Sequence, residues 1–445
     1  MGSEIRGEPG RTGTLLRLQT LQEPRHSRAS KRYRLSATDN RQLTNRQLML
    51  NVLRNRDYRL YWTGTLVSWV GTHLQGAAQA WYIYQITEKT FYVGLVGFFG
   101  QLPMVLTLLG GVVADRVDKR RLLLIAQSGL MVIAFVLGAL VDAHLAGVWT
   151  IAVLAMLAGM MSAFETPARH SLPAHLVGKK LLIQAIPLTS AAFNVARILG
   201  PAIAGALVSH VGVAKCFYAN GFSFIAVIVA LAMIRSDTSP ACNGDNPIWA
   251  DFWAGMGYIY RHPTIRPLVL MSGIPSLLVL PYLTLMPELA SKVLGLKATG
   301  YGSLMSSVGI GAALGAFRLA GDTRGKGRGK MLLLAGMSSA LVMLALSFSR
   351  SYPLSVVLFM LLGASNVTYN QTINTLVQTL ADNEYRARAV SAFIFVFVGL
   401  APIGSLMAGY LAGAFGVTVP LIVGGFGVAT LISLIALTQP EIRRL

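Results

Sequence analysis

Few ionisable side chains lie within the long apolar runs of this sequence, and those few are the first candidates for chemistry. Glu165 and Glu288 are the carboxylates that could lie inside such runs, and His73 is a histidine in the first run. A carboxyl or imidazole group among apolar residues can gain or lose a proton when its surroundings change. Glu165, Glu288 and His73 are therefore candidates for carrying a proton.

Each of the three also has a purely structural interpretation. Glu165 can cap the loop that follows it, or pair with Arg169 one helical turn later. Glu288 lies near the end of its run, where it can simply meet water. His73 can pack against neighbouring side chains without titrating. The sequence leaves both interpretations open for each residue.

A polar stripe runs along the first apolar run. Its members recur at intervals of three and four residues, so they share one side of a helix. They are Thr65, Ser68, Thr72, Gln75 and Gln79. Polar side chains within lipid must face other protein groups or water. The stripe therefore predicts either hydrogen bonds between helices or the wall of a cavity that binds a solute.

The fifth apolar run carries Ser190, Asn194 and Arg197 on one face. Arg197 is the one cation that we expect deep within a bilayer, where its insertion costs at least ~2.5 kcal/mol. It therefore needs a partner or a water-filled site. It can pair with backbone carbonyl groups, or it can attract an anionic solute or sense protonation, and Ser190 and Asn194 would then help to line the site.

A short charged loop joins the second and third apolar runs, within residues 110–121. Its glycine and charged residues include Gly111, Asp115, Arg116, Asp118, Arg120 and Arg121. Cations at a membrane face are typical of a loop that fixes topology. The two carboxylates allow a second interpretation, a conformational latch in which Asp115 and the arginines bridge helices in one state of the protein.

The composition indicates a membrane as the environment of these residues. Of the 445 residues, 54% are hydrophobic and 13% are charged, whereas soluble domains carry about 25% charged residues. The formal net charge is +20, but the cations lie in short loops between apolar runs rather than on one folded face. The sequence therefore predicts an integral membrane protein that contacts lipids and does not bind nucleic acid.

A helix that crosses a bilayer needs about 20 apolar residues, and runs of that kind predict about twelve spanning helices. The runs cover residues 58–84, 92–114, 121–142, 146–168, 183–210, 214–235, 264–290, 299–321, 330–349, 352–375, 388–414 and 417–438. An even number of spans places both termini on one side. Lysine and arginine are more frequent in the loops on that side, which predicts that both termini are cytoplasmic.

The runs divide six and six. Residues 1–55 are polar and arginine-rich, which predicts a disordered basic tail. The first six-helix half then covers 56–235, a linker with an amphipathic surface helix covers 236–262, and the second half covers 263–445.

The two halves show traces of an internal repeat, which is the architecture of many transporters. Gly110 and Gly311 are separated by the same number of residues as Pro201 and Pro402, so each pair occupies equivalent positions in the two halves.

The sequence shows no sign of enzyme chemistry. It has no histidine and cysteine cluster with metal-ligand spacing, no phosphate-binding glycine loop that ends in lysine, and no nucleophile beside a base. Cys216 and Cys242 are expected on opposite sides of the membrane, so no disulfide is predicted between them. We expect no cofactor and no metal.

Several stretches resemble a known family. The loop 111–121 is similar to the signature loop of the major facilitator superfamily, although Asp118 stands where that loop usually has glycine. Residues 58–62, 70–75, 166–169 and 194–202 resemble its secretion-effector branch, which includes the enterobactin exporter and macrolide efflux proteins. The resemblance covers about residues 55–440. It implies an all-α membrane protein with the major facilitator fold, and we expect a monomer.

The resemblance implies a secondary active exporter of lipophilic or amphipathic small molecules, of the antibiotic or siderophore class, in a bacterial inner membrane. Such an exporter works by alternating access and proton antiport, and Glu165→Gln is then expected to abolish proton-driven export. The alternatives are an importer or lipid flippase on the same fold, and a membrane sensor that transports nothing. The polar stripe and the charged loop favour transport, because a scaffold needs no hydrated interior.

Overall fold

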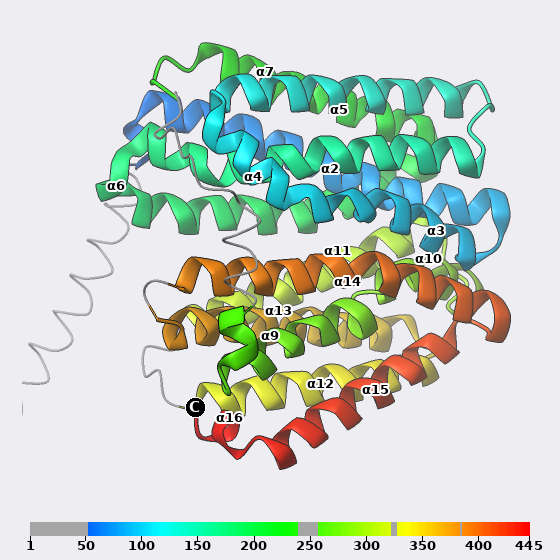
Figure 1. Ribbon diagram of the computed structural model, residues 1–445. Coiled ribbons are helices and arrows are strands. Elements are labelled where there is room, and N and C mark those ends of the chain that lie inside the picture. The colour runs from blue at the N-terminus through cyan, green and yellow to red at the C-terminus, as the bar shows by residue number, and fades with distance from the viewer. Residues whose placement is uncertain (1–51, 239–256, 322–326, 383–384) are drawn as a thin grey trace, which may run out of the picture. The chain divides into compact units, whose positions relative to one another are not determined.

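The structure is a computed structural model that describes residues 52–238, 257–321, 327–382 and 385–445. The described part of the chain contains helices and no strands. Figure 1 shows the helices in two bundles, the first in blue to green and the second in green to red. The predicted tail before residue 52 lies outside the described residues, as does 239–256, which is most of the predicted linker. Residues 257–261, at the end of the predicted surface helix, are helical.

The first bundle is built from α2 to α7. Its elements are α2 (Arg56–Thr87), α3 (Thr90–Gln101), η1 (Leu102–Leu106), α4 (Thr107–Arg116), α5 (Lys119–Asp142), α6 (Val148–Val211) and α7 (Val213–Met233). The second bundle is built from α9 to α16. Its elements are α9 (Ile265–Ile274), η2 (Pro275–Val279), α10 (Tyr282–Glu288), η3 (Leu289–Val293), α11 (Ala298–Ala320), α12 (Arg328–Phe348), α13 (Tyr352–Leu380), α14 (Arg386–Phe415), α15 (Thr418–Thr438) and α16 (Pro440–Arg444).

The number of spans agrees with the predicted count. Ten described helices are long and apolar enough to cross a membrane, and the bent pair Thr90–Leu106 and Leu109–Arg116 forms an eleventh. The helix α2 has 32 residues, which at about 1.5 Å per residue exceeds the ~30 Å of a bilayer core. Its polar side chains lower its hydropathy, and counting it gives the twelve spans that the apolar runs predicted.

The long element α6 consists of two spans, Val148–Gly178 and Leu181–Val211. They meet at Gly178, whose φ of 71° is a conformation that glycine adopts without strain. The first span extends beyond the predicted run 146–168, and four prolines lie inside α6. Pro201 is one of them and does not break its helix, because neighbouring groups can satisfy the backbone around a proline in a membrane helix.

The predicted internal repeat has a structural counterpart. A Cβ atom on Gly110 would lie 2.3 Å from the carbonyl oxygen of Ala163, and one on Gly311 would lie 1.8 Å from that of Met360. Both glycines therefore sit where the second span of a half crosses the fourth. Close backbone approach at small residues is a main source of helix association in lipid, so the two halves use the same device at matching places.

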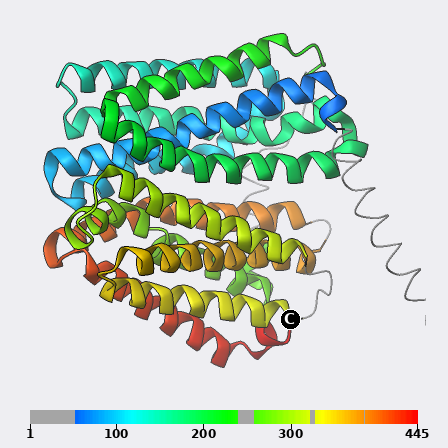
Figure 2. The same ribbon diagram turned by 180° about the vertical axis from the view of Figure 1, so that it is seen from behind.

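Two names describe the ends of the bundles. The terminal side is the side on which α2 begins and α15 ends, and the far side is the opposite one. Figure 2 shows from behind that the chain end at Leu445 and the start of α2 lie at the same side.

Candidate functional site

A cavity of about 870 Å³ lies between the two bundles. The first bundle contributes Trp69 and side chains from both spans of α6, and the second contributes side chains from α11, α12 and α13. All of the lining residues belong to the terminal-side portions of their helices or to the middle. The cavity therefore opens towards the terminal side and ends near the centre of the bundles.

The structure brings Ser190, Asn194 and Arg197 together in the wall of this cavity. Arg197 lies at the middle of its span, and its Nη2 donates a hydrogen bond to Oδ1 of Asn194 at 3.3 Å. Its Nε is buried without a hydrogen-bond partner among the described residues. No described carboxylate lies within ion-pair distance of it. The sequence predicted that Arg197 needs either a partner or a water-filled site, and the structure places it in a cavity.

Glu165 is buried at 3% exposure and belongs to a chain of polar contacts beside the cavity. It pairs with Arg169 and accepts a hydrogen bond from Nε2 of Gln127. The hydroxyl of Ser68 donates to Oε1 of Gln127 at 3.4 Å, and the Arg169 guanidinium lies 5.2 Å from the centre of the Trp69 ring. The expected pair with Arg169 is present. Glu165 does not cap a loop, because its helix continues to Gly178.

The polar stripe of α2 does not line the cavity. The residue of α2 in the cavity wall is Trp69, which is not part of the stripe. Gln75 accepts a hydrogen bond from Nδ2 of Asn220 in α7 at 2.7 Å, and Thr72 donates to the backbone of its own helix. Together with Ser68, Gln75 makes the bonds between helices that were the alternative interpretation. A role of Thr65, Ser68, Thr72, Gln75 and Gln79 in solute binding stays a prediction.

His73 lies outside the cavity wall. Its ring packs edge-on against Phe193, with ring centres 5.3 Å apart. Its role in carrying a proton also stays a prediction.

Glu288 takes part in a contact between the two bundles on the far side. The hydroxyl of Thr90, the first residue of α3, donates to Oε2 of Glu288. Lys292 lies 3.6 Å from Oε1 of Glu288, donates to the backbone oxygen of Glu88 at 3.3 Å, and lies over the Tyr84 ring. The carboxylate of Glu288 lies at the positive N-terminal end of α3, and the ammonium of Lys292 lies at the negative C-terminal end of α2. Both arrangements are favourable for the helix dipoles.

Close packing completes this far-side closure. Trp81 of the first bundle stacks on Tyr301 of the second, with ring centres 5.2 Å apart. A Cβ atom on Gly302 would lie 2.4 Å from the backbone oxygen of Pro201, and one on Gly94 would lie equally close to the backbone of α14. The two bundles therefore touch at backbone level on the far side, whereas a cavity separates them on the terminal side.

The charged loop after α4 is held within the first bundle. Asp118 caps α5, because its Oδ1 accepts from the backbone N–H of Arg121 at 2.8 Å. Its Oδ2 accepts from the hydroxyl of Thr238 at 2.8 Å, and Nη2 of Arg120 donates to the backbone oxygen of Ala232 at 2.5 Å. The loop thereby joins the start of α5 to the end of α7.

The other residues of the charged loop lie at the surface or in open space. Asp115 and Arg116 are exposed at the end of α4, and a side chain on Gly111 would meet nothing within 4 Å. Since the contacts of Asp118 and Arg120 stay within one bundle, a latch that changes between two states stays a prediction.

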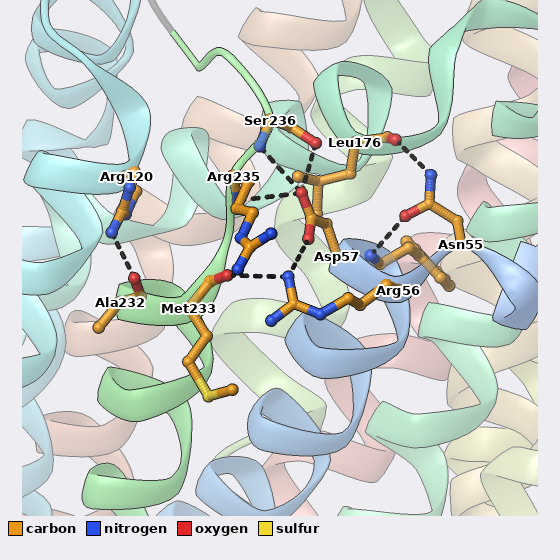
Figure 3. A network of polar contacts seen from close by, with 10 residues as sticks. Asn55, Arg56, Asp57, Arg120, Leu176, Ala232, Met233, Arg235 and Ser236 are labelled. Carbon is orange, nitrogen blue, oxygen red and sulfur yellow. Dashed lines mark hydrogen bonds and ion pairs between the residues drawn. The ribbon is translucent and has the colours of Figure 1, made fainter.

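Sequence reasoning missed the polar network at the start of α2, which Figure 3 shows. Asp57 is buried at 9% exposure, and its Oδ2 accepts from the backbone N–H of Arg235 at 3.0 Å and from the N–H and hydroxyl of Ser236 at 2.9 and 2.7 Å. Asn55 caps α2 and donates to the backbone of α6. An N-cap asparagine followed by an acid in the first turn was the available sequence signal.

We expect Asp57→Ala to destabilise the first bundle, because it leaves the N–H groups of Arg235 and Ser236 without an acceptor. An unsatisfied buried donor costs about 1–3 kcal/mol. A thermal unfolding scan of the purified protein in detergent should show a clearly lower Tm. Asp57→Asn keeps an oxygen acceptor and should lose less. Equal stability of the alanine variant and the natural chain would contradict this role.

The described residues contain no group of three histidine, cysteine, aspartate or glutamate side chains that could hold a metal. Cys216 is buried and free, and Cys242 lies outside the described residues.

Comparison with known proteins gives the family. Residues 49–445 match the model of the transmembrane secretion effector family. The chain is 25% identical to the staphyloferrin A transporter of Staphylococcus aureus, over 81% of this chain and 90% of that protein. It is also 25% identical to the multidrug efflux pump Tap of Mycolicibacterium fortuitum, over 85% and 95%. The same identity to the enterobactin exporter EntS of Shigella boydii extends over 89% and 95%.

Solved structures show the same fold at low identity. The nucleoside transporter NupG matches with a TM-score of 0.70 and 11% identity, over 86% of this chain and 98% of that one. The peptide transporter POT in complex with sulfate matches with a TM-score of 0.69 and 14% identity, over 88% and 95%. The predicted major facilitator fold is confirmed, and the family consists of transporters rather than enzymes. The chain therefore belongs to the transmembrane secretion effectors of the major facilitator superfamily, and it is a multi-pass membrane transporter.

Proposed function

We propose that this protein exports amphipathic small molecules, of the antibiotic or siderophore class, and that proton re-entry drives the export. The names of the multidrug efflux pump and the enterobactin exporter support the direction and the class of solute. We place the protein in a bacterial inner membrane with the terminal side in the cytoplasm, which the distribution of lysine and arginine supports.

The observation that carries the proposal is the asymmetry between the two sides. A cavity of about 870 Å³ opens on the terminal side, which is large enough for a drug-sized molecule. On the far side the bundles touch through Thr90 and Glu288 and through their glycines. This is the arrangement of a carrier that loads its solute from the terminal side, and release requires the far-side contacts to open.

Glu288 is the carboxylate that we propose to couple protons to this change. When the far side opens, Glu288 separates from Thr90 and is accessible to protons from outside. When the far side closes, its side chain is buried to 12% exposure. Burial of a charged carboxylate costs several kcal/mol, whereas burial of a neutral carboxyl group costs far less.

The cation nearest to Glu288 is Lys292. Lys292 is 53% exposed, so its ion pair is worth about 0–1 kcal/mol. The end of α3 adds about 0.3–1 kcal/mol. The other ionisable neighbours of Glu288 are Tyr84 and Glu88, and neither side chain is positively charged. In this proposal, protonation of Glu288 from outside favours closure of the far side and returns the empty carrier to the loading state. Glu288 must then release this proton towards the terminal side before the far side opens again, so that one proton enters in each cycle.

Purified protein in lipid vesicles tests the proposal. An amphipathic fluorescent solute is loaded, a pH gradient is imposed from either side, and the direction of solute movement is measured. Movement opposite to the proton gradient is the expected result. Movement with the protons would instead favour the importer, and an inert protein would favour the sensor.

A further inference from the structure

We propose that the cavity takes an amphipathic organic anion and that Arg197 binds its charged group. This inference rests on the proposed transport function and names the chemical class of its solute. It is carried by the charges and the apolar surface of the cavity wall.

The charged side chains in the described wall are all cationic. Arg169, Arg197 and Arg328 line the cavity, and none of the described lining residues is aspartate or glutamate. Arg169 is balanced by Glu165. Arg197 and Arg328 have no ion-pair partner among the described residues. Among the described side chains, Arg328 at the mouth, where α12 begins, and Arg197 at the deepest point thus have no carboxylate partner.

Two nitrogen donors in the wall lack an acceptor. Nε of Arg197 and Nε1 of Trp69 are both buried without a hydrogen-bond partner in the described structure, and Trp69 is only 7% exposed. Both atoms are closed off from the cavity, so a solute meets Arg197 at the part of its guanidinium that lines the cavity. Carboxylate, sulfonate and phosphate groups bind a guanidinium strongly.

The remainder of the wall fits an apolar body attached to that group. Ile186, Phe193, Leu319 and Met331 line the cavity between its mouth and Arg197. Removal of apolar solute surface from water against such side chains favours binding. A small inorganic anion would leave this surface unused. The solute class is therefore an anion with a sizeable hydrophobic part.

A cationic solute does not fit the same wall. It would meet Arg197 and Arg328 without a carboxylate to compensate them, because Glu165 is already bound to Arg169 and Gln127. Like charges in a site of low dielectric repel strongly, so the cavity should discriminate by the sign of the charge.

Binding of two matched probes to the purified full-length protein tests this inference. Pyrene-1-butyrate and pyrene-1-butylammonium share their ring and chain and differ in the sign of their charge. Fluorescence anisotropy should show that the butyrate binds at least about tenfold more tightly. Arg197→Gln should weaken butyrate binding by about tenfold or more, as expected for loss of a hydrogen bond to a charged group. It should not weaken ammonium binding.

A second cavity variant and a control variant complete the test. Asn194→Asp places a carboxylate at the position that already contacts Arg197 at 3.3 Å, so it should abolish butyrate binding while the arginine remains. Arg350→Gln removes a far-side arginine that bonds only to backbone oxygens, and it should change nothing. Size-exclusion profiles confirm that each variant is folded.

Several outcomes would overturn the inference. These are equal affinity for the two probes, tighter binding of the ammonium, absence of butyrate binding, and unchanged butyrate binding in both cavity variants. The transport proposal is tested separately by labelling of Ser405→Cys from the far side, which reports on opening without any solute. If the far side opens but the cavity has no preference for anions, only the solute class fails.

Discussion

Gly302→Leu should abolish transport while leaving the protein folded. Gly302 faces the other bundle, and even a Cβ atom there would lie 2.4 Å from the backbone oxygen of Pro201 and 3.0 Å from the Cα atom of Gly205. A leucine side chain therefore prevents the bundles from closing on the far side. The carrier should remain open to that side, unable to load solute from the terminal side, and transport into or out of vesicles should fall by more than tenfold.

Cysteine labelling measures the conformational cause of this loss. In a chain whose two cysteines are replaced by serine, Ser405→Cys reports on the far side, since Ser405 is buried beside Gly94. Asn194→Cys reports on the cavity. When Gly302→Leu is added, an impermeant maleimide applied from the far side should label Ser405→Cys more. The same reagent applied from the terminal side should label Asn194→Cys less.

Two glycine controls separate closure from folding. Gly311→Leu places a side chain against the backbone of Met360 within one bundle, so it should prevent folding. Gly76→Leu points into open space and should transport normally. Full transport by Gly302→Leu would show that far-side closure is not part of the cycle.

In Glu288→Gln, an imposed pH gradient should no longer accelerate export. The glutamine is neutral at every pH and can keep its contact with Thr90, so the far side closes whether or not protons are supplied. We expect the stimulation by the gradient to fall from severalfold to none, while efflux down a solute gradient continues. Vesicle transport at a fixed solute gradient, with and without a proton gradient, measures the ratio.

Glu165→Gln is the matched control, since it removes the other carboxylate that lies within a span. Glu165 contacts Arg169 and Gln127 within the first bundle and takes no described part in the far-side closure. If Glu288 couples the protons, Glu165→Gln should keep its response to the gradient. It should also bind the anionic probe more tightly, because Arg169 then lacks its partner.

The opposite result has a definite meaning. Loss of the response in Glu165→Gln alone would place the coupling at Glu165. Protonation of Glu165 leaves Arg169 unpaired, so a proton and an anion would then favour each other's binding in the cavity. The two would move in the same direction, which would support the importer on the same fold.

The apolar runs were enough to predict the class of the protein and its spans. A bilayer allows only closed backbone hydrogen bonding, so a run of about 20 apolar residues must be a helix. That constraint is local, and it predicted helices from 58–84 to 417–438 that the structure confirms within a few residues at most ends. It failed at the end of the fourth run, because the helix continues past residue 168 to Gly178.

Helical spacing also grouped Ser190, Asn194 and Arg197 on one face, and the structure places all three in the cavity. The same reasoning grouped the stripe of α2, but periodicity shows only that side chains share a face. Whether that face meets a cavity or a neighbouring helix depends on which helices pack beside it. Asn220 of α7 and Gln127 of α5 bond to the stripe, and neither is near it in the sequence.

The contacts of each ionisable group depend on how distant helices pack, and the sequence pattern did not predict them. Glu165 and Glu288 look alike as isolated carboxylates in apolar runs. One lies within the first bundle against Gln127 and Arg169, and the other joins the bundles through Thr90. These contacts arise when two six-helix halves meet, and the energy of a buried charge depends on such neighbours rather than on the charge itself. Local sequence pattern predicts the helices. It does not predict which distant helices pack together, and that packing gives the two carboxylates different roles.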